Sequence, residues 1–141
     1  MKTLILLLFL AISTNVFSQE FYFCDNVNDD WSPVGASSVK DAGGLHLLTK
    51  LDNKVYNQLY MWVIYKTDKE GNDTEFVNEY AMRIEDADII TDGARFFCTT
   101  EKINFEPGSY RVYFIYENVK EPNFKNGNLT KYLSKGEVTI K

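Results

Sequence analysis

The stretch FEPGSYRVYFIY, from Phe105 to Tyr116, decides the fold. Pro107 and Gly108 are typical of a tight turn, because proline fixes φ at one central position and glycine accepts a positive φ at the next. After the turn, apolar and aromatic residues continue almost without a break to Tyr116, which is typical of a β-strand with two apolar faces. We therefore expect a strand over Tyr110–Glu117, and its second apolar face needs an explanation.

The rest of the chain repeats this pattern of short apolar runs. Their period is two or they are continuous, and Gly, Pro, Asn and Asp separate them about every ten residues. Helix signals are nearly absent. We expect further strands at Glu20–Cys24, Leu45–Leu51, Asn57–Lys66, Glu75–Ile84, Ala94–Thr100 and Gly136–Lys141, with one more short strand at Lys131–Leu133. Without room for crossover helices, these strands must pair mostly antiparallel and pack face to face. The predicted fold is all-β, a single antiparallel β-sandwich of seven to eight strands.

Two segments point to a more specific kind of sandwich. The run Phe-x-Pro-Gly-x-Tyr-x-Val at 105–112 resembles the approach to a late strand in immunoglobulin-like and fibronectin-like domains, where a tyrosine hydrogen-bonds back across the corner. The final GEVTIK, residues 136–141, resembles the closing strand of such a domain. The resemblance rests on these two segments, implies an immunoglobulin-like sandwich and carries no function. The antibody pattern of Cys, Trp and Cys does not fit, because no suitably placed second cysteine follows Trp62.

The first 18 residues have the features of a signal peptide. Lys2 supplies one positive charge, Leu4–Ile12 is an apolar run too short for a stable membrane anchor, and Val16 and Ser18 are small residues where a signal peptidase needs them. We expect cleavage near Ser18/Gln19, a secreted or periplasmic protein, and one domain over residues 19–141 with no membrane span. A lipoprotein signal at Cys24 is disfavoured because Phe23 precedes the cysteine.

The charge of the chain argues against nucleic acid as a partner. Its formal net charge is −5, and its basic residues are scattered singly. Proteins that bind a phosphate backbone concentrate Lys and Arg on one face.

Cys24 and Cys98 are the two cysteines of the chain. An exported protein passes through an oxidising compartment, so we favour a disulfide between them. The alternative is that both are small buried side chains on strands that never meet. The sequence has no CxxC motif and no Cys/His spacing that suggests a redox or zinc site.

The surplus of aromatic residues is the main hint of function. If Tyr60, Trp62, Tyr113 and Ile115 lay side by side in solvent, their patch would have the size of an interaction surface. A covering loop such as Asp25–Asp41, a homodimer contact or a bound ligand would each explain the second apolar faces. The candidate ligand-binding residues are Tyr60, Trp62, Tyr113 and, in that loop, Trp31.

Metal and catalytic signals are weak. Asp25, Asp29 and Asp30 could offer oxygen ligands to calcium, but their spacing does not match an EF-hand loop, and the acidic cluster Glu85–Asp88 is typical of a solvated strand end. The single histidine, His46, has no adjacent nucleophile motif, so we interpret it as a strand residue with an ordinary hydrogen bond. We expect no metal, no cofactor and no catalytic residue. Asn72 and Asn128 begin glycosylation sequons, which matter only in a eukaryotic pathway.

Two functional hypotheses follow. The first is a secreted, non-enzymatic module that binds a protein or a glycan through an aromatic sheet face or its loops. The second is a small secreted hydrolase that uses carboxylates of its acidic loops, for which Asp30 is the residue to test.

Overall fold

A computed structural model describes residues 20–51, 59–83, 90–91, 94–116 and 124–141. These residues form an all-β structure in which one short 3-10 turn, η2 (Phe124–Asn126), accompanies the strands. No helix in the described ranges is long and apolar enough to cross a membrane. The expected signal peptide, its cleavage point at Ser18/Gln19 and the cluster Glu85–Asp88 lie outside the described residues.

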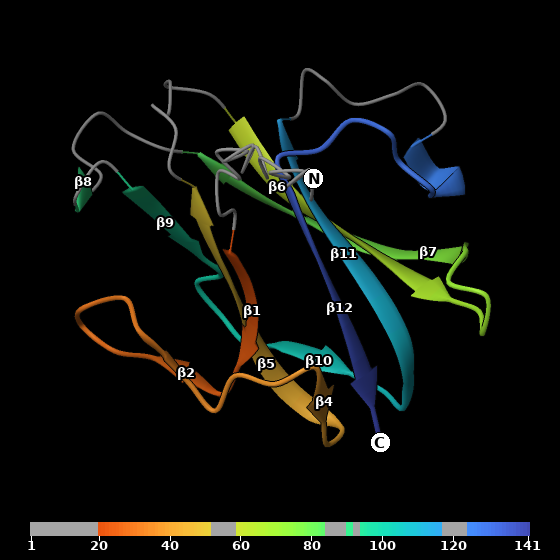
Figure 1. Cartoon of the computed structure of the whole chain (residues 1–141), viewed down its shortest axis with the longest axis horizontal. Helices are drawn as coiled ribbons and strands as arrows, with labels where there is room; N and C mark the ends of the chain where they lie inside the picture. Colours follow the sequence, from red (N-terminus) through yellow and green to blue (C-terminus); the bar gives the residue numbers. More distant parts are fainter. Residues whose placement is uncertain (1–19, 52–58, 84–89, 92–93, 117–123) are drawn as a thin grey trace, which may run out of the picture.

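Two sheets pack face to face as a β-sandwich (Figure 1). The first sheet has the order β1 (Glu20–Cys24), β5 (Gly43–Leu51), β9 (Ala94–Cys98), β8 (Ile90–Thr91), and β10 (Ile103–Phe105) also pairs with β5. The second has the order β4 (Val39–Lys40), β12 (Ser134–Ile140), β11 (Gly108–Tyr116), β6 (Leu59–Thr67), β7 (Asp73–Arg83). The strands β2 (Asn26–Val27) and β3 (Pro33–Val34) form a separate two-stranded sheet. Every pairing is antiparallel except that of β4 with β12.

Each of the seven long strands expected from the sequence has a counterpart among these elements. The expected short strand at Lys131–Leu133 is wrong, because those residues are irregular and only the backbone N–H of Leu133 bonds to the carbonyl of Phe114. The short strands β2, β3, β4, β8 and β10 were not expected, because segments of two or three residues carry no readable period. The chain bends at Pro107, and Gly108, the first residue of β11, has the expected positive φ, 150°.

The main core lies between the sheets, with the central strands β6 and β11 of the second sheet supplying its largest side chains. Tyr60 and Trp62 from β6 pack against Phe114 of β11, and Tyr60 and Phe114 also contact Phe97 of the first sheet, with ring centroids 4.9–5.5 Å apart. The indole N–H of Trp62 donates to the hydroxyl of Thr49 on β5, 3.1 Å away. Burial of these rings between the sheets explains one of the two apolar faces of β6 and β11.

The outer face of the second sheet is also covered. Met61, Val63 and Tyr65 from β6, with Tyr113 and Ile115 from β11, form a second buried cluster under Leu129 and beside Phe76. The cover therefore comes from the segment that follows η2, and not from the Asp25–Asp41 loop.

A buried carboxylate fixes this cover to the sheet. Asp73 accepts hydrogen bonds from the hydroxyl of Tyr113 (2.7 Å) and the backbone N–H of Asn128, and it pairs with Arg111 at 2.9 Å. The side chain of Asn128 in turn accepts the backbone N–H of Asp73. Gly127 permits the approach, because it has φ 72° and a Cβ there would lie 2.4 Å from the Cβ of Asp73.

The Asp25–Asp41 loop contributes to the outer face of the first sheet instead. There the hairpin β2–β3 places Trp31 on Phe96 of β9, with ring centroids 5.8 Å apart and planes 14° apart. Cys24 and Leu48, which point to that face, are fully buried. The loop named as one of the three explanations therefore covers an apolar face of the first sheet, and not the second faces of β6 and β11.

The two long sides of the sandwich differ. On one side β1 and β12 meet near the middle of Figure 1. A Cβ on Gly136 of β12 would lie 2.4 Å from the ring of Phe21, so only glycine allows this approach. On the other side β7 and the edge formed by β9 and β10 leave a cleft.

Candidate binding site

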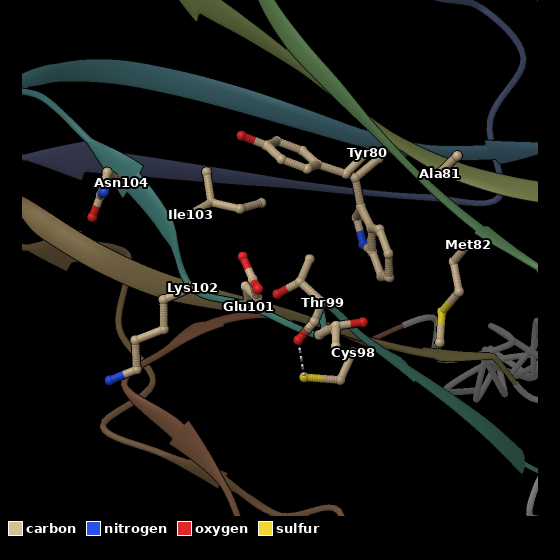
Figure 2. A pocket seen from close by; sticks show the side chains of 11 residues that line it. Tyr80, Ala81, Met82, Cys98, Thr99, Glu101, Lys102, Ile103 and Asn104 are labelled. Atoms are coloured by element: carbon tan, nitrogen blue, oxygen red, sulfur yellow. Dashed lines mark hydrogen bonds between the residues drawn. The ribbon is translucent and has the colours of Figure 1, made fainter.

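The cleft between β7 and the β9–β10 edge has a volume of about 690 Å³ (Figure 2). Its lining comes from three places: the core strand β6, the second half of β7, and the run from the last residue of β9 to the middle of β10. The lining residues are Trp62, Tyr80, Ala81, Met82, Cys98, Thr99, Thr100, Glu101, Lys102, Ile103 and Asn104. A cavity of this size is within the range of ligand-binding pockets.

The β7 wall and the floor are apolar. Tyr80 and Met82 are two residues apart on β7, so both side chains lie on the face that is turned to the core. They pair with Trp62 and Tyr60 of β6. Trp62 and Ile103 close the floor and are almost completely buried. An apolar group that entered the cleft would therefore contact Tyr80 and Met82 first.

The opposite wall exists because the edge of the first sheet is interrupted. Leu47 of β5 exchanges hydrogen bonds with Thr99, donating to its hydroxyl and accepting from its backbone N–H, each at 3.1 Å. Regular pairing resumes only at Ile103, which lies opposite Leu45. Four residue steps thus separate Thr99 from Ile103, whereas two steps separate Leu47 from Leu45 on β5. Because the edge has two more residues than β5 here, the segment Thr100–Lys102 bulges outward and forms the rim.

The two charged residues of the rim point in different directions. The side chain of Lys102 extends away from Tyr80 and Met82, whereas Glu101 lies on the cleft side (Figure 2). A Cβ on Gly44, which faces outward from β5, would lie 3.0 Å from the Cβ of Lys102. Burial raises the pKa of Cys24 on that same outer face, and the charge of Lys102 is one of the smaller effects that oppose the rise. The carboxylate of Glu101 is therefore the charge that the cleft presents, and no described residue forms a salt bridge with it.

Cys98 lines the cleft and His46 lies next to its Thr99 wall, but the two do not form a reactive pair. The Nδ1 atom of His46 lies 3.0 Å from the carbonyl oxygen of Thr99, which can only accept, so Nδ1 carries the proton. It therefore cannot take a proton from the Cys98 thiol, whose sulfur lies 3.8 Å away. Burial, with a smaller effect of Cys24, raises the pKa of Cys98 to about 11, so the thiol stays protonated at neutral pH.

The expected disulfide between Cys24 and Cys98 is not formed, and both cysteines are free thiols. Cys24 lies opposite His46 on one side of β5, and Cys98 lies opposite Leu48 on the other side. Two inter-strand spacings amount to roughly 9.6 Å, which exceeds the Cα separation of about 7 Å that a disulfide tolerates. A count of cysteines could not reveal that a third strand separates them.

The candidates for an exposed aromatic patch, Tyr60, Trp62 and Tyr113, are buried. Their exposed fractions are 0%, 1% and 2%. The register places Trp62 opposite Phe114 and Tyr113 opposite Val63, so Tyr113 and Ile115 are on the other face of the sheet from Tyr60 and Trp62. Trp62 forms part of the floor of the cleft, whereas Tyr60 and Tyr113 are not among the residues that line it.

Trp31, the fourth candidate, is partly exposed and has a strained backbone conformation. It has φ 66°, which is disfavoured for a side chain with a Cβ. The hairpin needs this conformation, because the N–H of Trp31 donates to the carbonyl of Asn28 and the N–H of Asn28 donates to the carbonyl of Ser32. Its stacking on Phe96 accounts for the position of the ring without a ligand.

The acidic residues of the same loop are engaged separately. Asp25 pairs with Lys40 at 2.7 Å, and Asp30 accepts from the backbone N–H of Ser32 and bonds to its hydroxyl. The described ranges contain no group of three or more His, Cys, Asp or Glu side chains that could hold a metal ion.

Sequence reasoning missed the residues that shape the cleft. Tyr80 and Met82 show the alternation of a strand with one buried face, and Thr99–Glu101 is a short polar run after a strand. Neither signal indicates that the two segments face each other. The chain matches no protein-family model and no curated protein sequence.

Proposed function

We propose that this chain is a secreted, non-enzymatic module that binds a protein or a glycan in the cleft between β7 and the β9–β10 edge. The observation that carries the proposal is the composition of that cleft: aromatic and apolar side chains from β6 and β7 face a rim of hydroxyl and carboxylate groups. Ligand sites combine apolar walls with a few polar groups in this way. Export itself rests on the apolar segment Leu4–Ile12.

We propose in addition that the sandwich is immunoglobulin-like. The hydroxyl of Tyr110, at the start of β11, donates to the carbonyl of Glu106 at 2.9 Å, which is the corner contact implied by the sequence resemblance. The order β12-β11-β6-β7 in one sheet and β1-β5-β9 in the other agrees with this class. Such sandwiches serve many functions, so the class supports the fold and leaves the binding argument with the cleft.

The hydrolase alternative has less support. A glycosidase needs two carboxylates across the bond that it cleaves. Among the described residues that line the cleft, Glu101 is the only acidic one. Asp30, the residue named for this alternative, belongs to the β2–β3 hairpin on the outer face of the first sheet and is hydrogen-bonded to Ser32.

Tryptophan fluorescence tests the binding proposal. In a Trp31→Phe background Trp62 is the remaining tryptophan, and it lines the cleft. A panel of oligosaccharides and peptides should contain a ligand that changes this signal saturably, and Tyr80→Ala should weaken that response. The matched control is Tyr132→Ala, because Tyr132 is 41% exposed and packs on Tyr113 over the opposite face of the second sheet.

Trp62→Ala is not a suitable test, because removal of a buried indole costs about 3–5 kcal/mol and would disturb the fold. If the whole panel leaves Trp62 unchanged, or if Tyr80→Ala and Tyr132→Ala weaken binding equally, the cleft is not the binding site.

A further inference from the structure

The carboxylate of Glu101 gives the cleft a negative charge that no described residue neutralises. Lys102, the neighbouring cation, extends away from Tyr80 and Met82 (Figure 2), and its Cβ lies beside Gly44 on the outer face of β5. No described residue forms an ion pair or a side-chain hydrogen bond with Glu101. The nearby hydroxyl of Thr99 already accepts the N–H of Leu47. A ligand that supplied a cation would therefore have an acceptor without displacing an internal partner.

The remaining walls suit the uncharged part of such a ligand. Tyr80 and Met82 form a half-buried apolar wall, and the floor is Trp62 and Ile103. An aromatic ring attracts a cation through its face, and a guanidinium, the more frequent partner in proteins, can also stack on the ring. A thioether adapts to a flexible aliphatic stem. These features fit a group with an aliphatic stem and a planar cationic end.

We propose that the cleft receives an arginine side chain from a protein partner, with the stem along Met82 and Tyr80 and the guanidinium on the carboxylate of Glu101. This inference rests on the proposed binding function and names its ligand class. Charge complementarity favours it over a glycan, because a neutral sugar would leave Glu101 with hydroxyl donors only, whereas a guanidinium offers a bidentate, charge-assisted pair. The net charge of −5 also favours encounter with basic partners.

The test uses N-acetyl-arginine methylamide and its neutral isostere N-acetyl-citrulline methylamide at equal ionic strength. Amide chemical shifts of Tyr80–Met82 and Thr99–Ile103 report binding in the cleft. The arginine probe should shift these signals saturably and bind about tenfold more tightly than the citrulline probe, as for the loss of one charged hydrogen bond. Glu101→Gln should abolish this difference. The matched control is Glu106→Gln, which removes an exposed carboxylate outside the cleft and should preserve the difference.

The outcomes separate this inference from the function on which it depends. Equal binding of both probes, or a preference for arginine that survives Glu101→Gln, overturns the arginine inference and leaves a cleft that binds neutral groups. If the arginine probe gives no shift in the cleft, the inference is also wrong. The binding function falls with it only when the oligosaccharide and peptide panel gives no response either.

Discussion

The indole nitrogen of Trp62 donates a hydrogen bond to the hydroxyl of Thr49, 3.1 Å away, and thereby connects the two sheets through the core. Both residues are buried, so neither group can turn to water when its partner is lost. This bond holds Trp62 in place at the floor of the cleft.

Thr49→Val should therefore destabilise the protein by about 1–3 kcal/mol, because it leaves the indole N–H buried without an acceptor. Urea denaturation measures the change. Thr139→Val on β12 makes the same substitution at an exposed position and should stay within about 0.5 kcal/mol of the wild type. Equal effects at the two positions would show that the bond contributes nothing specific.

The second prediction concerns the carboxylate that fixes the cover over the second sheet. Asp73→Ala should cost at least about 3 kcal/mol, because it removes the partner of a largely buried Arg111 and the acceptor of Tyr113. Glu137→Ala removes the other carboxylate that pairs with Arg111, but that side chain is 61% exposed. Its cost should be at most about 1 kcal/mol. Similar unfolding free energies for the two variants would contradict the assignment of Asp73 as the fixing residue.

The third prediction is a loss of stability at alkaline pH. Burial raises the pKa of Cys24 and of Cys98 from 9.0 to about 11, with smaller contributions from Asp25 and from Cys24, respectively. Burial, followed by the hydrogen bond to Asp73, raises the pKa of Tyr113 from 10.0 to about 12. Each group binds its proton more tightly in the folded state, so its contribution is fully present below pH 9 or 10 and is lost as the pH rises through 11 to 12.

Denaturation curves between pH 7 and pH 12 should show this decline beginning near the unfolded-state pKa of the thiols. In a Cys24→Ala/Cys98→Ala variant the onset should move up toward the unfolded-state pKa of Tyr113. An onset that the double variant leaves in place would exclude the thiols as its cause.

Mass analysis of the purified protein should also find two free thiols, and a native disulfide would contradict the register of β1, β5 and β9.

The fourth prediction concerns the strained backbone of Trp31. Trp31→Ala and Trp31→Gly both remove the ring that stacks on Phe96. Only glycine relieves the positive φ of 66°, so the glycine variant should be more stable than the alanine variant by about 1 kcal/mol. Thermal denaturation of the pair measures this. If the alanine variant is the more stable one, the hairpin does not need the left-handed conformation.

The sequence predicted the strands well because each long strand carries its own evidence. The apolar runs of β5, β6 and β11, and the Pro107–Gly108 turn, depend on residues close together in the chain. The Tyr110 hydroxyl bonds to a carbonyl only four residues away, so this corner could also be expected.

The candidate site could not be predicted in the same way, because it depends on pairing across the sheet. One residue of register decides whether Trp62 lies beside Phe114 or Tyr113, and the apolar pattern of both strands is compatible with either arrangement. The covers over the outer faces come from irregular segments around Trp31 and Leu129 that have no period. The cleft itself results from the interrupted edge at Thr100–Lys102, where a polar run gave no sign that it faces β7.

The most direct test of the binding account is an amide chemical-shift map of the wild-type protein with the oligosaccharide and peptide panel. The account predicts that a bound ligand shifts the signals of Tyr80–Met82 and Thr99–Ile103, the two walls of the cleft, and leaves those around Trp31 and Tyr132 unchanged. Shifts confined to the outer faces of the sandwich would contradict it.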